Sequence, residues 1–206
     1  MRKILNPDLS YTFRDYFLMS SNILTQDIIA EFGYGFEEKK LSLPRSQSEL
    51  QHFAALQDRI FRTKKTLGLS NESARREGLV APILLDTAFY SNSFARIEYQ
   101  IEVTPQLKGI LDYYLRNETA LLVVEAKDSD LRRGFTQLAV ELIAFDVANE
   151  TEQSVLYGAV TTGEEWRFGK LERQSKIVTQ DENFYFVPQD LEEISRILVG
   201  IMEQKI

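Results

Sequence analysis

Residues 96–103 constrain the fold of this chain more than any other stretch, because apolar and polar side chains alternate there without exception. Alternation with a period of two predicts a strand with one buried face. Two more strands are expected directly after it, at 109–115 and 120–127, with a turn at 117–119 between them. Upstream, apolar residues recur at helical spacing instead. Helices therefore precede a set of closely connected strands.

The remaining elements follow from the same two periods. Helices are expected over 25–31, 46–67, 72–85, 129–148 and from Pro188 onward, with Pro82 bending or ending the third. Strands are expected over 34–43, 154–162, 166–171 and 176–179. This order predicts an α/β fold with a mixed central β-sheet flanked by helices. We expect one compact unit, in which residues 1–68 form a helical and extended segment packed on a core of residues 69–206.

The composition removes several classes of chemistry. Among 206 residues there is no cysteine and a single histidine, His52. Thiolate nucleophiles, disulfides, cysteine-ligated zinc and multi-histidine metal sites are therefore excluded. A histidine-dependent triad would rest on His52 alone, which lies in a stretch typical of an exposed helix surface. The available groups are carboxylates, lysine, hydroxyls and a hard metal ion.

The charge pattern leaves two interpretations open. The net charge of −7 argues against tight non-specific binding to nucleic acid. Residues 57–76 nevertheless carry six basic side chains against Asp58 and Glu72. This run is either a solvated helix face or a phosphate-binding surface. Its basic residues are Arg59, Arg62, Lys64, Lys65, Arg75 and Arg76.

The sequence predicts no membrane segment. No apolar stretch approaches the ~20 residues that cross a bilayer, and no hydrophobic segment follows the basic first residues. We therefore expect no membrane association and a cytoplasmic location.

The strand predicted at 120–127 becomes charged at its end. Glu125 and Lys127 are two residues apart and project to one side, while Ala126 points to the other. Asp112 lies in the middle of the neighbouring strand, and a carboxylate buried there needs a cation or a metal as partner. Two carboxylates near a backbone carbonyl suit a hard divalent ion such as Mg²⁺. Lys127 beside that ion would orient an attacking water, so the set predicts metal-assisted phosphodiester hydrolysis.

Asp112, followed after a hairpin by Glu125-Ala126-Lys127, resembles the PD-(D/E)XK, or restriction-endonuclease-like, nuclease superfamily. More narrowly, residues 71–85 resemble the helix that opens the nuclease domain of type I restriction R subunits and their small relatives. Gln137 and residues 157–166 also match those domains, and the resemblance covers residues 71–171. Leu111 stands where the family has the proline of its motif.

The resemblance implies a restriction-endonuclease-like fold and a nuclease that needs Mg²⁺ or Mn²⁺. Its substrate would be a nucleic acid, with DNA as the first candidate, cut to leave 5′-phosphate and 3′-hydroxyl ends. Asp112, Glu125 and Lys127 would be catalytic. Asp112, Glu125 and the Ala126 carbonyl would hold the metal, and Glu72 would approach the metal or its waters. Glu77 is a second candidate for that place, and a plain helix N-terminal acid is the alternative role for Glu72.

Contacts to the substrate are expected from Gln137, Arg133, Lys64, Lys65 and Arg75. Arg133, Gln137 and Glu141 are spaced by four, so they share one helix stripe, and the alternative is an ordinary i,i+4 network. The chief rival to a nuclease is an inactive module of this fold that binds nucleic acid or a partner protein. A structural subunit with a solvated acidic cluster is a third reading. Small nucleases of this fold often dimerise, so a homodimer is a candidate assembly.

Overall fold

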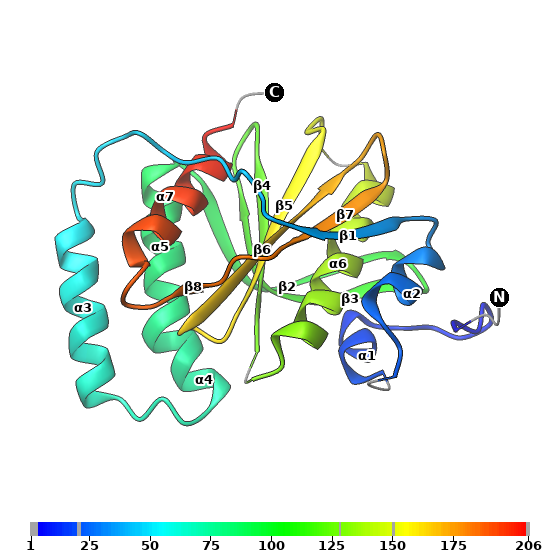
Figure 1. Cartoon of the computed structure of the whole chain (residues 1–206), viewed down its shortest axis with the longest axis horizontal. Coiled ribbons are helices and arrows are strands. Elements are labelled where there is room, and N and C mark those ends of the chain that lie inside the picture. The colour runs from blue at the N-terminus through cyan, green and yellow to red at the C-terminus, as the bar shows by residue number, and fades with distance from the viewer. Residues whose placement is uncertain (1–3, 20–21, 128, 150, 205–206) are drawn as a thin grey trace.

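The computed structural model describes residues 4–19, 22–127, 129–149 and 151–204. Its centre is an eight-stranded mixed sheet in the order β1-β7-β6-β5-β4-β3-β2, with β8 paired to β6 (Figure 1). Neighbouring strands are antiparallel except for β1–β7 and β4–β5. The predicted α/β fold with a mixed central sheet is confirmed. The strands are β1 (Gly35–Lys39), β2 (Phe94–Thr104), β3 (Leu107–Arg116), β4 (Leu121–Ala126), β5 (Val155–Thr161), β6 (Glu165–Glu172), β7 (Ile177–Asp181) and β8 (Tyr185–Phe186).

Helices cover both faces of the sheet (Figure 1). One face carries α1 (Phe13–Leu18), α2 (Thr25–Ala30) and α6 (Leu131–Ala148). The other carries α3 (Phe53–Thr66), α5 (Ala81–Tyr90) and α7 (Leu191–Met202). Each face has its own apolar core among the described residues. No helix in the described part of the chain is both long and apolar enough to span a bilayer.

The first sixty-eight residues contribute to both faces and to the sheet itself. β1 pairs in parallel with β7 at one edge, and α1 and α2 pack on α6. The helix expected from residue 46 begins only at Phe53. The reason is tertiary: the Ser46 N–H donates to the Arg196 carbonyl at 2.9 Å, which holds the preceding chain extended against α7. The boundary at residue 68 stays a prediction.

The helix expected over 72–85 runs on to Tyr90, so Pro82 does not end it, and a π-helical turn lies just before the proline. The helix consists of α4 (Glu72–Arg75), the π-helical turn η1 (Arg76–Val80) and α5, with Pro82 in the first turn of α5. The Ala81 N–H donates to the Arg76 carbonyl, five residues back. This wide turn accommodates the proline ring without ending the helix. The final helix, expected from Pro188, begins at Leu191.

The outer strand β2 does not keep a single buried face. Glu98 has a φ of 52°, and the side chains before and after it face different environments. Tyr99 packs with the α6-side core, whereas Ile97 is 54% exposed. The paired strand changes face at the same level, since Leu111 belongs to the α6-side core and Tyr113 to the α5-side core. The single face predicted for residues 96–103 is therefore wrong at Ile97.

Candidate active site

The candidate site lies where β3 and β4 separate. Their pairing ends with Tyr113 opposite Val124, one residue before Asp112 and Glu125. Beyond this pair, the backbone hydrogen bonds between β3 and β4 stop. The Ala126 N–H donates instead to the side chain of Asp112, at 2.8 Å from Oδ2. Asp112 also lies at the level of Glu98, where both strands change face. A fork between two strands thus brings both predicted carboxylates to one place.

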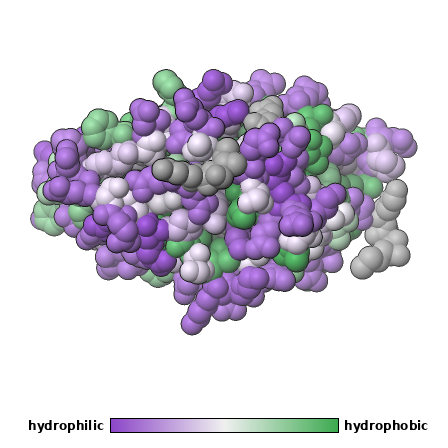
Figure 2. Space-filling view, turned by 90° about the horizontal axis from the view of Figure 1, so that it is seen from above, coloured by the Kyte–Doolittle hydropathy of each residue, from purple (hydrophilic) through white to green (hydrophobic). Residues whose placement is uncertain are grey.

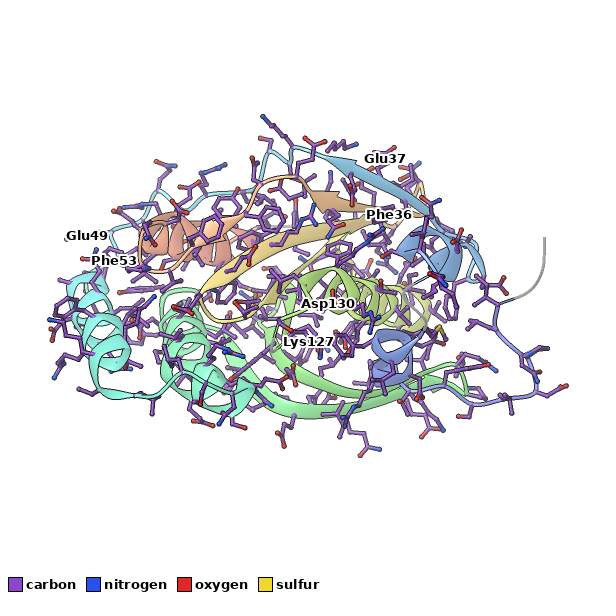
Figure 3. The ribbon with its side chains drawn as sticks, turned by 60° about the horizontal axis from the view of Figure 1, so that its bottom comes forward. Phe36, Glu37, Glu49, Phe53, Lys127 and Asp130 are labelled. Atoms are coloured by element: carbon purple, nitrogen blue, oxygen red, sulfur yellow. The ribbon has the colours of Figure 1, made fainter. Side chains whose placement is uncertain are left out.

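Glu125 and Lys127 project together toward α6, as their spacing predicted. The Lys127 ammonium donates to Glu125 Oε1, and the two side chains are 11% and 1% exposed. The Lys127 N–H donates to the Thr161 carbonyl at 2.8 Å, which extends the parallel pairing of β4 with β5. Lys127 lies near the middle of the molecule beside the start of α6 (Figure 3).

Helix α6 comes close to Lys127 because residue 134 is glycine. A Cβ at Gly134 would lie 2.6 Å from Val160 Cγ2 and 2.9 Å from Lys127 Cγ. Asp130 caps the helix by accepting from the Arg133 N–H at 3.1 Å. The helix start is therefore held against the strand that carries Glu125 and Lys127.

Two buried side chains of α6 complete the cluster. Gln137 Nε2 donates to Glu125 Oε1 at 2.6 Å and to Glu141 Oε1 at 2.9 Å. Both side chains are almost fully buried. Of the predicted stripe, Gln137 and Glu141 form an i,i+4 pair that faces the site rather than solvent. Arg133 pairs with Asp130 instead and is 40% exposed. Glu141 is a site residue that the sequence reasoning placed on the stripe without giving it a role.

Three oxygen atoms of this cluster lack hydrogen-bond partners among the described residues. They are Glu125 Oε2, Gln137 Oε1 and Glu141 Oε2, all buried. Leaving such an acceptor unpaired costs about 1–3 kcal/mol, and more for a charged group. Oxygen-only ligands of this kind suit Mg²⁺ or Mn²⁺. The residues present therefore fit a hard divalent cation.

Burial and mutual repulsion dominate the electrostatics. Burial raises the pKa of Glu125 well above its ordinary value, and the neighbouring Glu141 and Asp112 charges add to the shift. Burial also raises the pKa of Glu141 to about 8. Burial alone would lower the pKa of Lys127, but the charges of Glu125 and Asp112 outweigh it and keep that pKa raised. Lys127 therefore stays cationic, whereas the two glutamates hold protons at unusually high pH.

Asp112 has a cation partner that the sequence reasoning assigned elsewhere. Arg76, at the start of η1, places Nη1 3.6 Å from Asp112 Oδ1 and Nη2 3.5 Å from Glu98 Oε1. Its side chain is 16% exposed. Arg76 was expected only as part of the basic run 57–76. Its place is inside the site, and the buried aspartate's need for a cation is the sequence signal that pointed to such a residue.

Glu72, the other predicted metal ligand, does not join a cluster of metal-binding side chains among the described residues. Glu72 is half-buried at the start of α4, and Glu77 is exposed. Within the part of the chain that the structure describes, no three carboxylate or histidine side chains stand close enough to hold a metal by themselves. Asp112, Glu125 and the Ala126 carbonyl lie at the strand fork without Glu72. Since Mg²⁺ commonly keeps several waters and one or two carboxylates, this set remains sufficient for it.

The predicted substrate contacts are dispersed. Lys64 pairs with Glu164 at 2.5 Å, and Lys65 lies 4.0 Å from the centre of the Phe61 ring. Arg75 donates to the Leu69 carbonyl at 2.9 Å. Arg133 pairs with Asp130 at 3.3 Å, at the start of α6. Each of these cations thus has an intramolecular contact.

No protein-family model matches the chain, and no curated protein matches it.

Proposed function

We propose that this protein is a Mg²⁺- or Mn²⁺-dependent nuclease that hydrolyses phosphodiester bonds, with DNA as its substrate. The observation that carries the proposal is the strand fork, where Asp112, Glu125 and Lys127 come together beside buried oxygen atoms without hydrogen-bond partners. This set of groups can hydrolyse a phosphodiester without cysteine and without using the chain's one histidine, His52.

Each side chain has a part that its contacts support. Asp112, Glu125 and the Ala126 carbonyl would hold the cation. When bound, the cation would polarise the phosphate and stabilise developing negative charge. Lys127, cationic and only 11% exposed, would orient the attacking water and face the phosphate. Gln137 fixes the carboxylate of Glu125 through its amide, and Arg76 offsets the charge of Asp112.

The test is cleavage of plasmid and single-stranded DNA with Mg²⁺ or Mn²⁺ by the wild type and by Lys127→Ala. We expect Lys127→Ala to reduce turnover at least ~10²-fold, since it removes a preorganised charge that acts in the transition state. Metal and DNA binding should change little.

A matched control exists on β6. Lys170 forms the same i,i+2 pair with a glutamate, Glu172, at 2.5 Å, so Lys170→Ala should leave cleavage unchanged. Equal residual cleavage in the wild type, Lys127→Ala and Glu125→Ala would identify a contaminant and contradict the proposal.

The rival is an inactive module of the same fold. The observation that favours it is that both carboxylates already have cationic partners within the protein: Arg76 pairs with Asp112 and Lys127 pairs with Glu125. A divalent cation should raise the melting temperature of the nuclease through native-state binding. An unchanged melting temperature in millimolar Mn²⁺ favours the module.

A further inference from the structure

A cleft of about 730 Å³ lies at the other end of the same hairpin. The candidate active site is at the open end of β3 and β4, whereas this cleft adjoins the turn that joins them and the start of β2. Its lining includes Phe94, Arg96, Tyr99, Tyr114 and Arg116. Nothing in the proposed nuclease mechanism uses these residues.

Three stacked aromatic rings, from α6, β3 and β2, form the floor of the cleft. Phe145 of α6 is buried and stacks on Tyr114, with ring centres 5.2 Å apart and planes 13° apart. Tyr114 stacks on Tyr99 at 5.3 Å and 12°. The guanidinium of Arg96 lies 4.8 Å above the Tyr99 ring. The stack therefore runs from the core to the surface and ends in a planar cation.

Phe94 lies beside this stack and is the most exposed large apolar side chain described, at 82%. The strand register places it opposite Arg116, and Arg96, two residues along on the same face, stands opposite Tyr114. Arg96 forms no ion pair with a carboxylate in the described ranges. An open aromatic ring thus has an arginine on each side.

The turn beneath the cleft is held rigid by Asn117. Its side chain accepts from the Ala120 N–H at 2.7 Å and donates to the Met202 carbonyl at 2.9 Å. These bonds tie the hairpin to the end of α7. A binding surface fixed before the ligand arrives loses less conformational freedom on binding. Glu118 also lines the cleft and is the one acidic side chain among the described residues that line it.

We propose that this cleft binds a nucleotide, whose base stacks on Phe94 and whose phosphate contacts Arg96. Aromatic rings accept any base face, and arginine supplies both phosphate contact and a second stacking plane. The base must be unpaired, because stacking on a protein ring needs a base face free of its own helix. The inference deepens the proposed function. It rests on that function only for the claim that the bound nucleotide belongs to the strand that is cut. Arg116 is four residues from Asp112 along β3, ~13 Å at a rise of ~3.3 Å each, so one short strand reaches both places.

The experiment measures binding without cleavage, by fluorescence anisotropy in EDTA with a labelled oligothymidylate of about 12 nucleotides. Phe94→Ala and Arg96→Ala should each weaken binding about 10-fold, the usual effect of losing one stacking contact. Phe186→Ala removes another exposed ring, 47% exposed on β8, and should change affinity by less than about twofold. Far-ultraviolet circular dichroism of each variant confirms that it is folded.

The source of the nucleotide is tested by competition. Displacement of the oligonucleotide by millimolar thymidine monophosphate supports a site that accepts free nucleotides, and its failure supports a nucleotide within a strand. Equal affinity of the wild type, Phe94→Ala and Arg96→Ala overturns the inference, as does a wild type that binds neither probe.

The two proposals fail separately. If the protein cuts DNA in a Mg²⁺-dependent way but its affinity for the oligonucleotide does not depend on Phe94 and Arg96, the cleft proposal is rejected and the nuclease proposal stands. Binding that needs both residues in a chain that cuts nothing supports the cleft and rejects the nuclease.

Discussion

Glu125 and Glu141 share one amide donor deep in the protein, and this arrangement makes stability depend on pH. Both pKa values are raised by burial, that of Glu141 to about 8. The folded chain therefore holds protons that the unfolded chain releases above its ordinary glutamate pKa near 4.5. The resulting stabilisation is complete below pH ~4.5 and is lost as pH rises toward 8.

Glu141→Gln tests this coupling, because it keeps the shape and removes the ionisable group. We expect the variant to be more stable than the wild type at pH 8 by about 1–3 kcal/mol, and the difference to shrink toward pH 5. Urea unfolding at each pH measures it. Glu49→Gln, at an exposed glutamate, is the control and should show no such trend. A pH-independent difference for Glu141→Gln would contradict the linkage.

The strand period predicted that Glu125 and Lys127 share a face, and their side chains are paired in the structure. The sequence placed Gln137 by resemblance, as a substrate contact, and did not predict its bond to Glu125. The sequence could not predict that Arg76 pairs with Asp112. That contact depends on how the helix lies across the sheet, which no local pattern contains. The dispersed cations of α3 show the same limit, since a run of positive charge does not say which surface it faces.

At the scale of elements, the close approach of α6 to β4 and β5 positions the site. Alanine normally favours a helix over glycine by about 1 kcal/mol. Here the added Cβ at position 134 would meet Val160 at 2.6 Å. We expect Gly134→Ala to lower stability by about 1–3 kcal/mol, the usual effect of overpacking, and to reduce cleavage by displacing Lys127. Thermal unfolding and the cleavage assay measure both.

Gly68→Ala is the matched control, since nothing lies within 4 Å of a Cβ there. It should change stability by less than about 0.5 kcal/mol. A stabilised Gly134→Ala would mean that α6 is not held at this distance from the strands.

Element boundaries were less predictable than element types. The long helix α6 and the strands around it follow from apolar spacing, because their periods match their environment. The chain at residues 46–52 has helical spacing, but it is held against α7 by the Ser46–Arg196 backbone bond and by the Arg196 side chain, which donates to the Ser46 and Ser48 carbonyls. Glu98 lies within β2, where apolar and polar residues alternate without exception over 96–103, but its φ of 52° interrupts the alternation of faces. At residues 46–52 the contact with α7 overrides the local pattern, and at Glu98 the backbone conformation does.

For the whole molecule, the N-terminal helices form part of the α6-side core. Phe13 on α1 is fully buried and packs on the backbone of Gly109 in β3. We expect Phe13→Ala to lower the free energy of unfolding by about 3–5 kcal/mol. Leu18→Ala, at a residue of the same helix that is 59% exposed, should have little effect.

Unfolding should be a single transition. The one tryptophan, Trp166, lies in the α5-side core, on the opposite face from Phe13. Its fluorescence and the far-ultraviolet circular dichroism should report the same urea midpoint in the wild type and shift together in Phe13→Ala. Separate midpoints would show that the N-terminal segment unfolds on its own.

The break at Glu98 has a consequence for the behaviour of many copies in solution. β2 is the last strand of the sheet, and a long regular edge strand offers its free amide and carbonyl groups to any similar strand it meets. The left-handed residue in its middle interrupts that row, and Arg96, Glu98 and Glu102 place charge along it. Such features prevent edge-to-edge growth of sheets. The distortion beside Asp112 is therefore also expected to oppose edge-to-edge aggregation.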